Sequence, residues 1–471
     1  MIFNSIEFVL FLPIVIILYY LTPHKYRWIL LLSASYYFYM SWKVEYIFLI
    51  IFSTLVDYFS GLMMERYSSK KKRLPFLILS LVTNLGLLFY FKYYNFGVEN
   101  LNLLFDQIGI SKDFALMDFL LPVGISFYTF QTLSYSIDVY FGRLKAERHL
   151  GYFALYVSFF PQLVAGPIER FSSLTPQFKQ NHPFSYDNLA NGLRLILYGL
   201  FIKMVIADNL AIIVEKIYSS PENFSSLDIL TGISFYSFQI YSDFYGYSII
   251  AIGSALIMGI KLMDNFKTPY LAKNIAEFWQ RWHISLSTWF RDYLYFPLGG
   301  NKVKTSRWVI NIFLVFIISG FWHGANWTFI IWGGIFGVVY LIEHLLNKWF
   351  KIKTQHTSYS IQHFLLAVKT FIIVTIAWVF FRSQNITEAI QILSSIFKNS
   401  NVNTSELIIP TFVWVYFLLF ILSDFLLYNN RFDKWISSMP FIGRWSIYGI
   451  LLFSIISFAS IEEFPFIYFQ F

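Results

Sequence analysis

The chain has 471 residues, of which 57% are hydrophobic, 22% aromatic and only 13% charged. Soluble domains carry about 25% charged residues, and apolar stretches near the roughly 20 residues needed to cross a bilayer recur along the chain. This composition excludes a soluble protein and predicts an all-α polytopic membrane protein. The net charge is +8, and the basic residues stand between apolar segments. This placement is typical of topology signals and not of nucleic-acid binding. With no cysteine, disulfides, thiolate metal ligands and a protein thioester are excluded.

Twelve apolar segments are candidate membrane spans, and we expect some of the long ones to be broken or tilted. They lie near residues 6–22, 27–42, 44–63, 74–92, 115–140, 150–165, 188–212, 227–260, 307–345, 361–381, 407–428 and 442–460. The first has no basic region before it and no small-residue cleavage site after it, so it is interpreted as a membrane helix and not a signal peptide. The pattern predicts a bundle of about 11–13 spans.

Basic segments between the spans give an orientation. The densest are "HKYR" (24–27), "KKKR" (70–73), "GRLKAERH" (142–149), "NKWFKIK" (347–353) and "RFDK" (431–434). The positive-inside rule places these segments in the cytoplasm. The N-terminus, the loops at 41–45 and 93–114, and the tail at 461–471 are then extracytoplasmic. We expect a multi-pass protein of the cytoplasmic (inner) membrane.

Two segments do not resemble ordinary spans. "FFPQLVAGPIERF" (159–171) interrupts an apolar run with prolines and a glycine, and "FWQRWHISLSTWFRDYLYFPLGG" (278–300) is rich in polar and charged groups. Broken backbone at membrane depth is tolerated inside protein or along a wet cavity. Both segments are therefore predicted to form re-entrant or in-plane helices that line a cavity.

His323 lies inside the apolar stretch "SGFWHGANWTFIIWGG". On a continuous helix it shares a small, polar face with Ser319, Gly320, Asn326 and Trp327. Histidine titrates near neutral pH and is the usual general base, so His323 is a candidate catalytic residue. The alternative is a buried histidine that hydrogen-bonds a neighbouring helix.

His283 is the second candidate. Its helical face would hold Trp279 and Gln280, and the spacing of Glu277 and Arg281 favours an ion pair. The alternative is an interfacial amphipathic helix with Trp and Arg at headgroup level. Together with Asn326 and Trp327, Trp279 and Gln280 are the candidate substrate-binding residues.

Two intramembrane acids favour a rival function. Asp138 and Asp243 follow the near-identical sequences "GISFYTFQ" (124–131) and "GISFYSFQ" (232–239), and transporters often contain repeats. A secondary transporter or flippase would need these acids. The alternative, which we favour, is that tyrosine hydroxyls bind both acids and fix helix packing. No short metal-ligand spacing such as HExxH occurs among the eight histidines, so no metal site is predicted.

The chain ends in the aromatic sequence "PFIYFQF" (465–471), in which Tyr468 carries the only hydroxyl. Most chain ends are polar and frayed, whereas this tail is expected to dock into an apolar site. The alternative is a membrane-interface anchor, a common role of tyrosine and phenylalanine.

The motifs "SGFWHGANW" (319–327), 278–300 and 159–171 resemble the membrane-bound O-acyltransferases. They are most similar to the bacterial subgroup that acetylates alginate, peptidoglycan and cellulose, and the similarity covers nearly the whole chain. It implies one membrane acyltransferase domain over residues 1–471, built as a helical bundle around a central tunnel. The family's near-invariant histidine corresponds to His323. His283 stands where many eukaryotic members carry Asn or Asp, which leaves its role less defined.

The resemblance also implies a reaction. The donor would be cytoplasmic acetyl-CoA, with no cofactor, and the acetyl group would cross the bilayer for O-acetylation of a polysaccharide. A secreted serine-nucleophile (SGNH-type) acetyltransferase would be the partner that places it on the polymer. A sister branch transfers D-alanine to teichoic acid, and a tyrosine-containing aromatic motif in that system makes Tyr468 a candidate acyl relay. D-alanyl transfer is therefore an alternative, besides transport.

Overall fold

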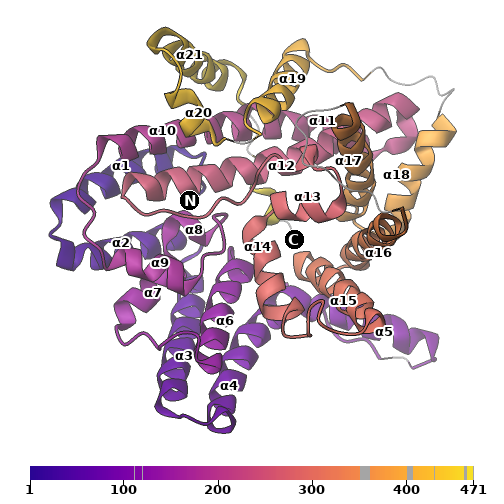
Figure 1. Ribbon diagram of the computed structural model, residues 1–471. Helices are drawn as coiled ribbons and strands as arrows, with labels where there is room; N and C mark the ends of the chain where they lie inside the picture. Colours follow the sequence, from indigo (N-terminus) through magenta and orange to yellow (C-terminus); the bar gives the residue numbers. More distant parts are fainter. Residues whose placement is uncertain are drawn as a thin grey trace. The chain divides into compact units, whose positions relative to one another are not determined.

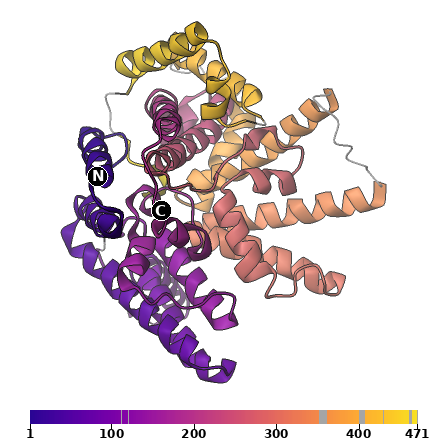
Figure 2. The ribbon, with the colours of Figure 1, turned by 60° about the vertical axis from the view of Figure 1, so that its left-hand side comes forward.

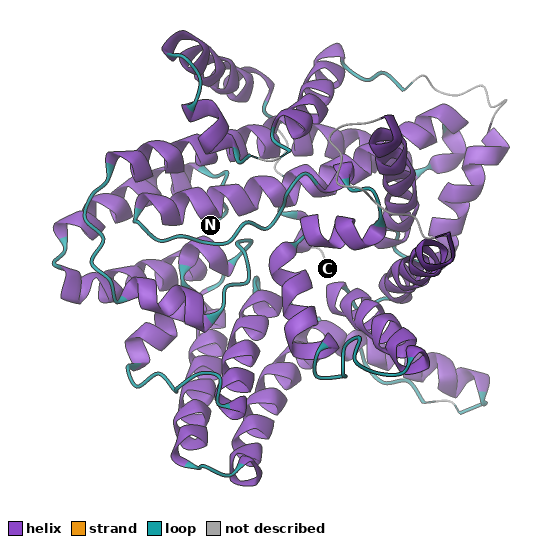
Figure 3. Ribbon diagram, viewed as in Figure 1, coloured by secondary structure: helices purple, strands orange, loops and turns teal. Residues whose placement is uncertain are grey.

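The computed structural model describes residues 1–110, 112–118, 120–350, 361–399, 407–428, 430–460 and 464–469. These residues form helices joined by loops, with no strand among them (Figure 3). Eight helices in this part of the chain are long and apolar enough to cross a membrane, and two shorter apolar helices accompany them. The prediction of an all-α polytopic membrane protein is confirmed. Parts of the basic segment 347–353 and of the tail 461–471 lie outside the described residues.

The chain divides into two compact units, residues 1–192 with 251–263, and residues 193–250 with 264–471. The first unit holds α1 (Ile6–Leu21), α2 (His24–Met40), α3 (Ile47–Arg66), α4 (Lys70–Leu88), α5 (Tyr94–Gln107), α6 (Ile125–Phe141), α7 (Leu150–Ser158), α8 (Phe160–Leu163), α9 (Phe171–Phe178) and the start of α10 (Tyr186–Phe201).

Helices α3, α4 and α6 lie side by side in the first unit (Figures 1 and 2). The fully buried Asp57 of α3 accepts hydrogen bonds from Ser80 (2.5 Å) and Asn84 (2.9 and 3.0 Å) of α4. Thr132 of α6 donates to the side-chain oxygen of Asn84 at 3.1 Å. A buried carboxylate is costly unless it is hydrogen-bonded, so this network holds the three helices in one register.

Three predicted segments of this unit differ in the structure. Residues 94–107 of the predicted loop 93–114 form α5, because a π-helical turn at Phe89–Tyr93 continues α4 and apolar residues recur at helical spacing. The span predicted from residue 115 begins only at Ile125, after Gly124, whose φ of 75° starts the helix. In place of a span at 150–165, two short buried helices occur, α7 and α8.

The second unit holds the rest of α10, a π-helical turn (Ile202–Ala207), α11 (Asp208–Ser219), most of α12 (Ser226–Ile257), α13 (Ile275–Arg281), α14 (Ile284–Phe290), α15 (Thr305–His323), α16 (Trp327–Phe350), α17 (Ile361–Arg382), α18 (Ile386–Lys398), α19 (Thr411–Leu426), α20 (Phe432–Ser437) and α21 (Phe441–Phe458). The predicted segment 278–300 is broken into short helices and turns. Between the predicted spans 361–381 and 407–428, residues 386–398 form the further helix α18.

The predicted span 307–345 is a hairpin of two helices, α15 and α16, which lie side by side (Figure 1). Glycines let the two backbones approach closely. A Cβ on Gly320 would lie 2.2 Å from the Phe329 carbonyl oxygen, and one on Gly333 would lie 2.3 Å from that of Phe316. The sequence "SGFWHGANWTFIIWGG" therefore encodes a tight helical hairpin with His323 at its bend.

Candidate active site

His323 is the last residue of α15, where the helix breaks. Gly324 is extended, and a Cβ at this position would lie 1.9 Å from the Phe329 ring, so glycine is needed for the bend. The His323 side chain is only 5% exposed. Its ring centroid lies 5.1 Å from that of Trp332 and 5.4 Å from that of Phe381. The bend presents the imidazole to an aromatic interior and not to a helix face.

His283 lies between α13 and α14 and not on a helix, so its predicted helical face is wrong. Its φ of 41° and ψ of 55° place it in the left-handed region. A residue other than glycine rarely adopts this backbone conformation, and such backbone strain concentrates at functional sites. The predicted pair of Glu277 and Arg281 is present at 2.9 Å and stabilises α13.

Asn265 orients the His283 ring. The Asn265 Oδ1 lies 3.0 Å from His283 Nδ1 and also accepts the Ser285 hydroxyl at 2.9 Å, while its Nδ2 donates to Ser248 at 3.1 Å. With its oxygen acting as an acceptor, Asn265 selects the tautomer that carries the proton on Nδ1. The acceptor lone pair of the imidazole is then on Nε2. Burial lowers the pKa of His283 well below its usual range, and the nearby His323 lowers it further, so both favour the neutral form of the ring.

Tyr468 of the C-terminal tail lies against both histidines. Its ring centroid is 5.7 Å from that of His323 and 6.5 Å from that of His283. Phe244 of α12 packs on Tyr468 at 4.6 Å and on His283 at 4.7 Å. The Tyr468 hydroxyl oxygen is buried, and burial raises the pKa of this phenol well above its usual range. Two imidazoles and one phenol thus meet in one buried cluster.

The predicted substrate-binding residues do not gather around His323. Gln280 is exposed and Trp327 is 51% exposed. Asn326 instead caps the start of α16, because its Oδ1 accepts the Thr328 N–H at 3.0 Å. The bend after His323 rotates Asn326 and Trp327 off the face that a continuous helix would have given them.

One residue, Trp332, connects Trp279 to the cluster. The ring centroid of Trp279 lies 5.6 Å from that of Trp332, which contacts His323. Trp332 is 1% exposed, and its indole N–H has no hydrogen-bond acceptor within the described part of the chain. Sequence reasoning missed Trp332 and Asn265. A buried indole N–H beside a candidate base is suited to stabilising an oxyanion.

Each of the two acids pairs with a basic side chain that the sequence did not predict. Asp138 lies 3.4 Å from Arg143. Asp243 is 3% exposed and pairs with Lys203 at 2.6 Å, where tyrosine hydroxyls were predicted. Lys203 could not be placed beside Asp243 from sequence, since 40 positions separate the two residues in the chain. No group of three His, Cys, Asp or Glu side chains suited to a metal ion occurs in the described residues.

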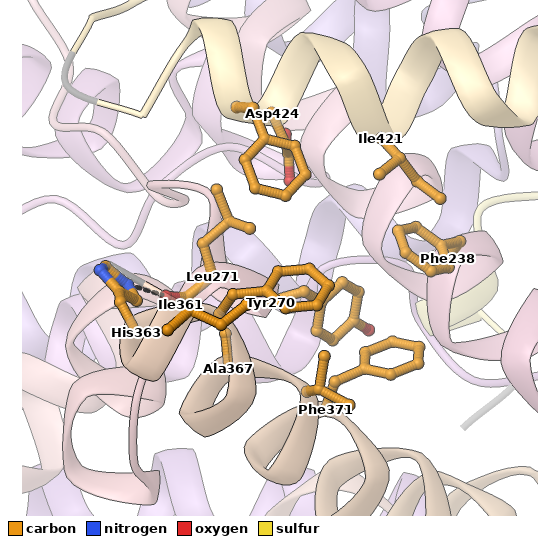
Figure 4. Close-up of a pocket in the computed structure, with 12 residues that line it drawn as sticks. Phe238, Tyr270, Leu271, Ile361, His363, Ala367, Phe371, Ile421 and Asp424 are labelled. Carbon is orange, nitrogen blue, oxygen red and sulfur yellow. Dashed lines mark hydrogen bonds between the residues drawn. The ribbon is translucent and has the colours of Figure 1, made fainter. Parts of the chain in front are cut away.

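A separate cavity of about 390 Å³ lies between α12, α17 and α19 (Figure 4). It is lined mainly by apolar side chains. His363 contributes its ring, whose Nε2 lies 3.1 Å from the Leu271 carbonyl oxygen, and the buried Asp424 contributes a carboxylate. Tyr241 binds that carboxylate at 3.1 Å. None of the predicted site residues lines this cavity.

Glu169, in the predicted re-entrant segment 159–171, gives the stability a pH dependence. It is 2% exposed and accepts the Met263 N–H at 2.5 Å, and burial raises its pKa to about 7. Since the folded protein holds this proton more tightly than the unfolded chain, stability falls as pH rises from about 4.5 to 7. The Glu169→Gln variant should lose this component, which is on the order of 3 kcal/mol at most.

Thermal unfolding of wild type and Glu169→Gln in detergent between pH 4.5 and 8 checks this expectation. The midpoint of the variant should rise relative to wild type with increasing pH. Parallel midpoints across the range would show that Glu169 titrates alike in the folded and unfolded states.

Comparisons with known proteins agree with the earlier resemblance. A family model described as the membrane-bound O-acyltransferase family matches residues 145–383, which include both histidines. The chain is 43% identical over 412 residues to the probable alginate O-acetylase AlgI of Pseudomonas syringae pv. tomato, covering 86% of this chain and 77% of that protein.

Two other relatives carry different names. The peptidoglycan O-acetyltransferase of Helicobacter pylori is 38% identical over 404 residues, covering 80% of this chain and 75% of that protein. The teichoic acid D-alanyltransferase of Bacillus subtilis is 34% identical over 241 residues, covering 49% of this chain and 60% of that protein. The family match, the extent of these alignments and the apolar helices make this multi-pass chain an acyltransferase, and it belongs to the membrane-bound O-acyltransferase family.

Proposed function

We propose that the chain is an O-acetyltransferase that moves an acetyl group from cytoplasmic acetyl-CoA through the bilayer for O-acetylation of a cell-surface or exported polysaccharide. The observation that carries this proposal is the buried cluster of His323, His283 and Tyr468. A phenol with a raised pKa is a poor nucleophile unless a base takes its proton. Two imidazoles beside the ring are suited to that role.

In the first step, His323 accepts the proton of the Tyr468 hydroxyl as its oxygen attacks the thioester carbonyl. The new ester O–C bond forms, the C–S bond of acetyl-CoA breaks, and the proton leaves with the CoA thiolate. The Trp332 indole N–H is a candidate donor to the intermediate oxyanion. In the second step an acceptor hydroxyl attacks the ester carbonyl of acetyl-Tyr468. The new acceptor O–C bond forms, the Tyr468 O–C bond breaks, and the acceptor's proton passes to the tyrosine oxygen, which restores the phenol.

The acceptor is proposed from the relatives, whose names specify alginate and peptidoglycan. The relay from Tyr468 to polymer would pass through a secreted SGNH-type serine acetyltransferase. We place the chain in the cytoplasmic (inner) membrane with both termini outside. D-alanyl transfer to teichoic acid is less favoured, because the matching relative covers only 49% of this chain.

Labelling with radioactive acetyl-CoA tests the relay. The purified protein in nanodiscs, without an acceptor, should carry label on the C-terminal tryptic peptide that follows Arg444. Hydroxylamine should release the label, as expected of a phenolic ester. The Tyr468→Phe variant keeps the ring packing but has no hydroxyl, so we expect no label on this peptide.

Other results of the same assay separate the alternatives. CoA release without label on protein would discard the tyrosine relay but retain the enzyme. If neither label nor CoA release occurs with acetyl-CoA, the acetyl donor is wrong, and loaded acyl carrier protein becomes the donor to test.

A further inference from the structure

A buried ion-pair cluster lies beside the C-terminal tail and has no part in the proposed chemistry. Lys203 lies in the π-helical turn between α10 and α11, and its ammonium is 2.7 Å from Asp208 and 2.6 Å from Asp243. Lys203 is 1% exposed, Asp243 3% and Asp208 4%. Charges buried at membrane depth are costly and are functional candidates by default.

The cluster is complete only when the tail is docked. An ammonium has three N–H donors. Lys203 donates one to Asp208 and one, at 3.1 Å, to the backbone oxygen of Phe464, and it forms an ion pair with Asp243 at 2.6 Å. The second carboxylate oxygen of Asp243 accepts the Ile467 N–H at 2.7 Å. The tail backbone therefore supplies one acceptor and one donor to buried charges that would otherwise be left partly unsatisfied.

The bound stretch of the tail leads directly into Tyr468. Phe466 is fully buried, and its ring centroid lies 4.7 Å from that of Tyr247, over which Lys203 lies at 5.5 Å. Ile467, whose N–H binds Asp243, is the residue immediately before Tyr468. Fixing the backbone at Phe464 and Ile467 thus fixes where the Tyr468 ring can reach.

We infer that Lys203 and Asp243 form a tail clamp that binds the backbone of residues 464–467 and positions Tyr468 between His323 and His283. Both are positioning residues, because they act on Tyr468 through the backbone of the preceding tail residues that they bind. Asp208 completes the cluster, and no hydrogen bond joins its side chain to the described tail residues 464–469. This inference rests on the proposed function for its catalytic consequence, but the docking of the tail is measurable without acyl transfer.

Cysteine accessibility reports docking directly, because the chain has no native cysteine. An Ile467→Cys substitution places a single thiol at a position that is 4% exposed. In the otherwise wild-type protein, a water-soluble maleimide should react slowly with it. Adding Asp243→Asn leaves one acceptor oxygen for two donors, so we expect the tail to open and the thiol to react about tenfold faster or more.

Asp208→Asn is the matched control. It removes the same charge from the same cluster but no hydrogen bond to tail residues 464–469, so the reaction rate should stay near that of the parent. Lys203→Met should behave like Asp243→Asn, and Asp243→Asn alone decides the question if Lys203→Met does not elute as a monodisperse peak. Acetyl label on Tyr468, measured in the native-Ile467 background, should fall about tenfold or more in Asp243→Asn and little in Asp208→Asn.

Equal maleimide rates in Asp243→Asn and the parent would overturn the clamp, whatever the enzyme activity. Faster reaction with undiminished labelling of Tyr468 would overturn its positioning role. If wild type transfers no acetyl group, the proposed function fails, and the maleimide rates still decide whether the clamp exists.

Discussion

Replacing His323 with alanine should lower the rate of CoA release from acetyl-CoA by about 10²–10⁴-fold, the usual contribution of a general base. The Tyr468 phenol is buried and its pKa is raised, so the proposed attack by its oxygen needs a neighbouring base to take the proton. His323 is the nearer of the two imidazoles, with 5.7 Å between the ring centroids. Single-turnover CoA release in nanodiscs measures the effect.

Two variants separate loss of the base from loss of packing. His323→Gln keeps a polar side chain of similar size but has no base, so it should be as inactive as the alanine variant. His363→Ala removes a histidine that lines the separate cavity between α12, α17 and α19, and it should retain the wild-type rate. Both need a thermal unfolding midpoint close to wild type.

A fully active His323→Ala protein would contradict the general-base role. The transporter hypothesis predicts that result together with an essential Asp138 or Asp243. In the structure Asp243 has different contacts from those of a transport site, because one carboxylate oxygen pairs with Lys203 and the other accepts the Ile467 N–H. Loss of function in Asp243→Asn alone would therefore not support transport.

Residue chemistry in an apolar setting, together with the family resemblance, selects His323, His283 and Tyr468 as candidates, and the structure brings the three side chains together. A histidine is expensive inside a membrane protein, so its presence indicates a candidate site. Tyr468 is selected differently, as the only hydroxyl of an aromatic tail. The meeting of the three was not predictable, because it depends on backbone that departs from a regular helix. His283 has a positive φ, and the tail returns Tyr468 to a helix more than 200 positions earlier in the chain.

The errors have the same origin. Gln280, Asn326 and Trp327 were assigned to the site by helical periodicity, which fails where α13 and α15 end. Lys203 and Asn265 were missed because each acquires its role only through contacts distant in sequence. Periodicity predicted most spans, since it reflects the apolar surface of regular helices, but broken helices form the site.

Replacing His283 should lower the rate of acetyl transfer by roughly 10²-fold if the ring handles a proton. The more informative variant is Asn265→Asp, which places a carboxylate where the amide oxygen now lies 3.0 Å from Nδ1. A carboxylate stabilises the imidazolium and raises the pKa of His283. A base with a higher pKa is protonated at higher pH, so the acid limb of the pH–rate profile should move upward.

Packing alone would not give this shift. If His283 only fills space against Phe244, Asn265→Asp lowers the rate by the same factor at every pH. Asn265→Ala is the control for a lost hydrogen bond, because the tautomer of His283 is then no longer fixed and no charge is added. This variant should reduce the rate about tenfold without moving the acid limb. An acid limb that moves only in Asn265→Asp would establish that the protonation state of His283 controls the rate, and that the strained backbone at this residue serves the chemistry.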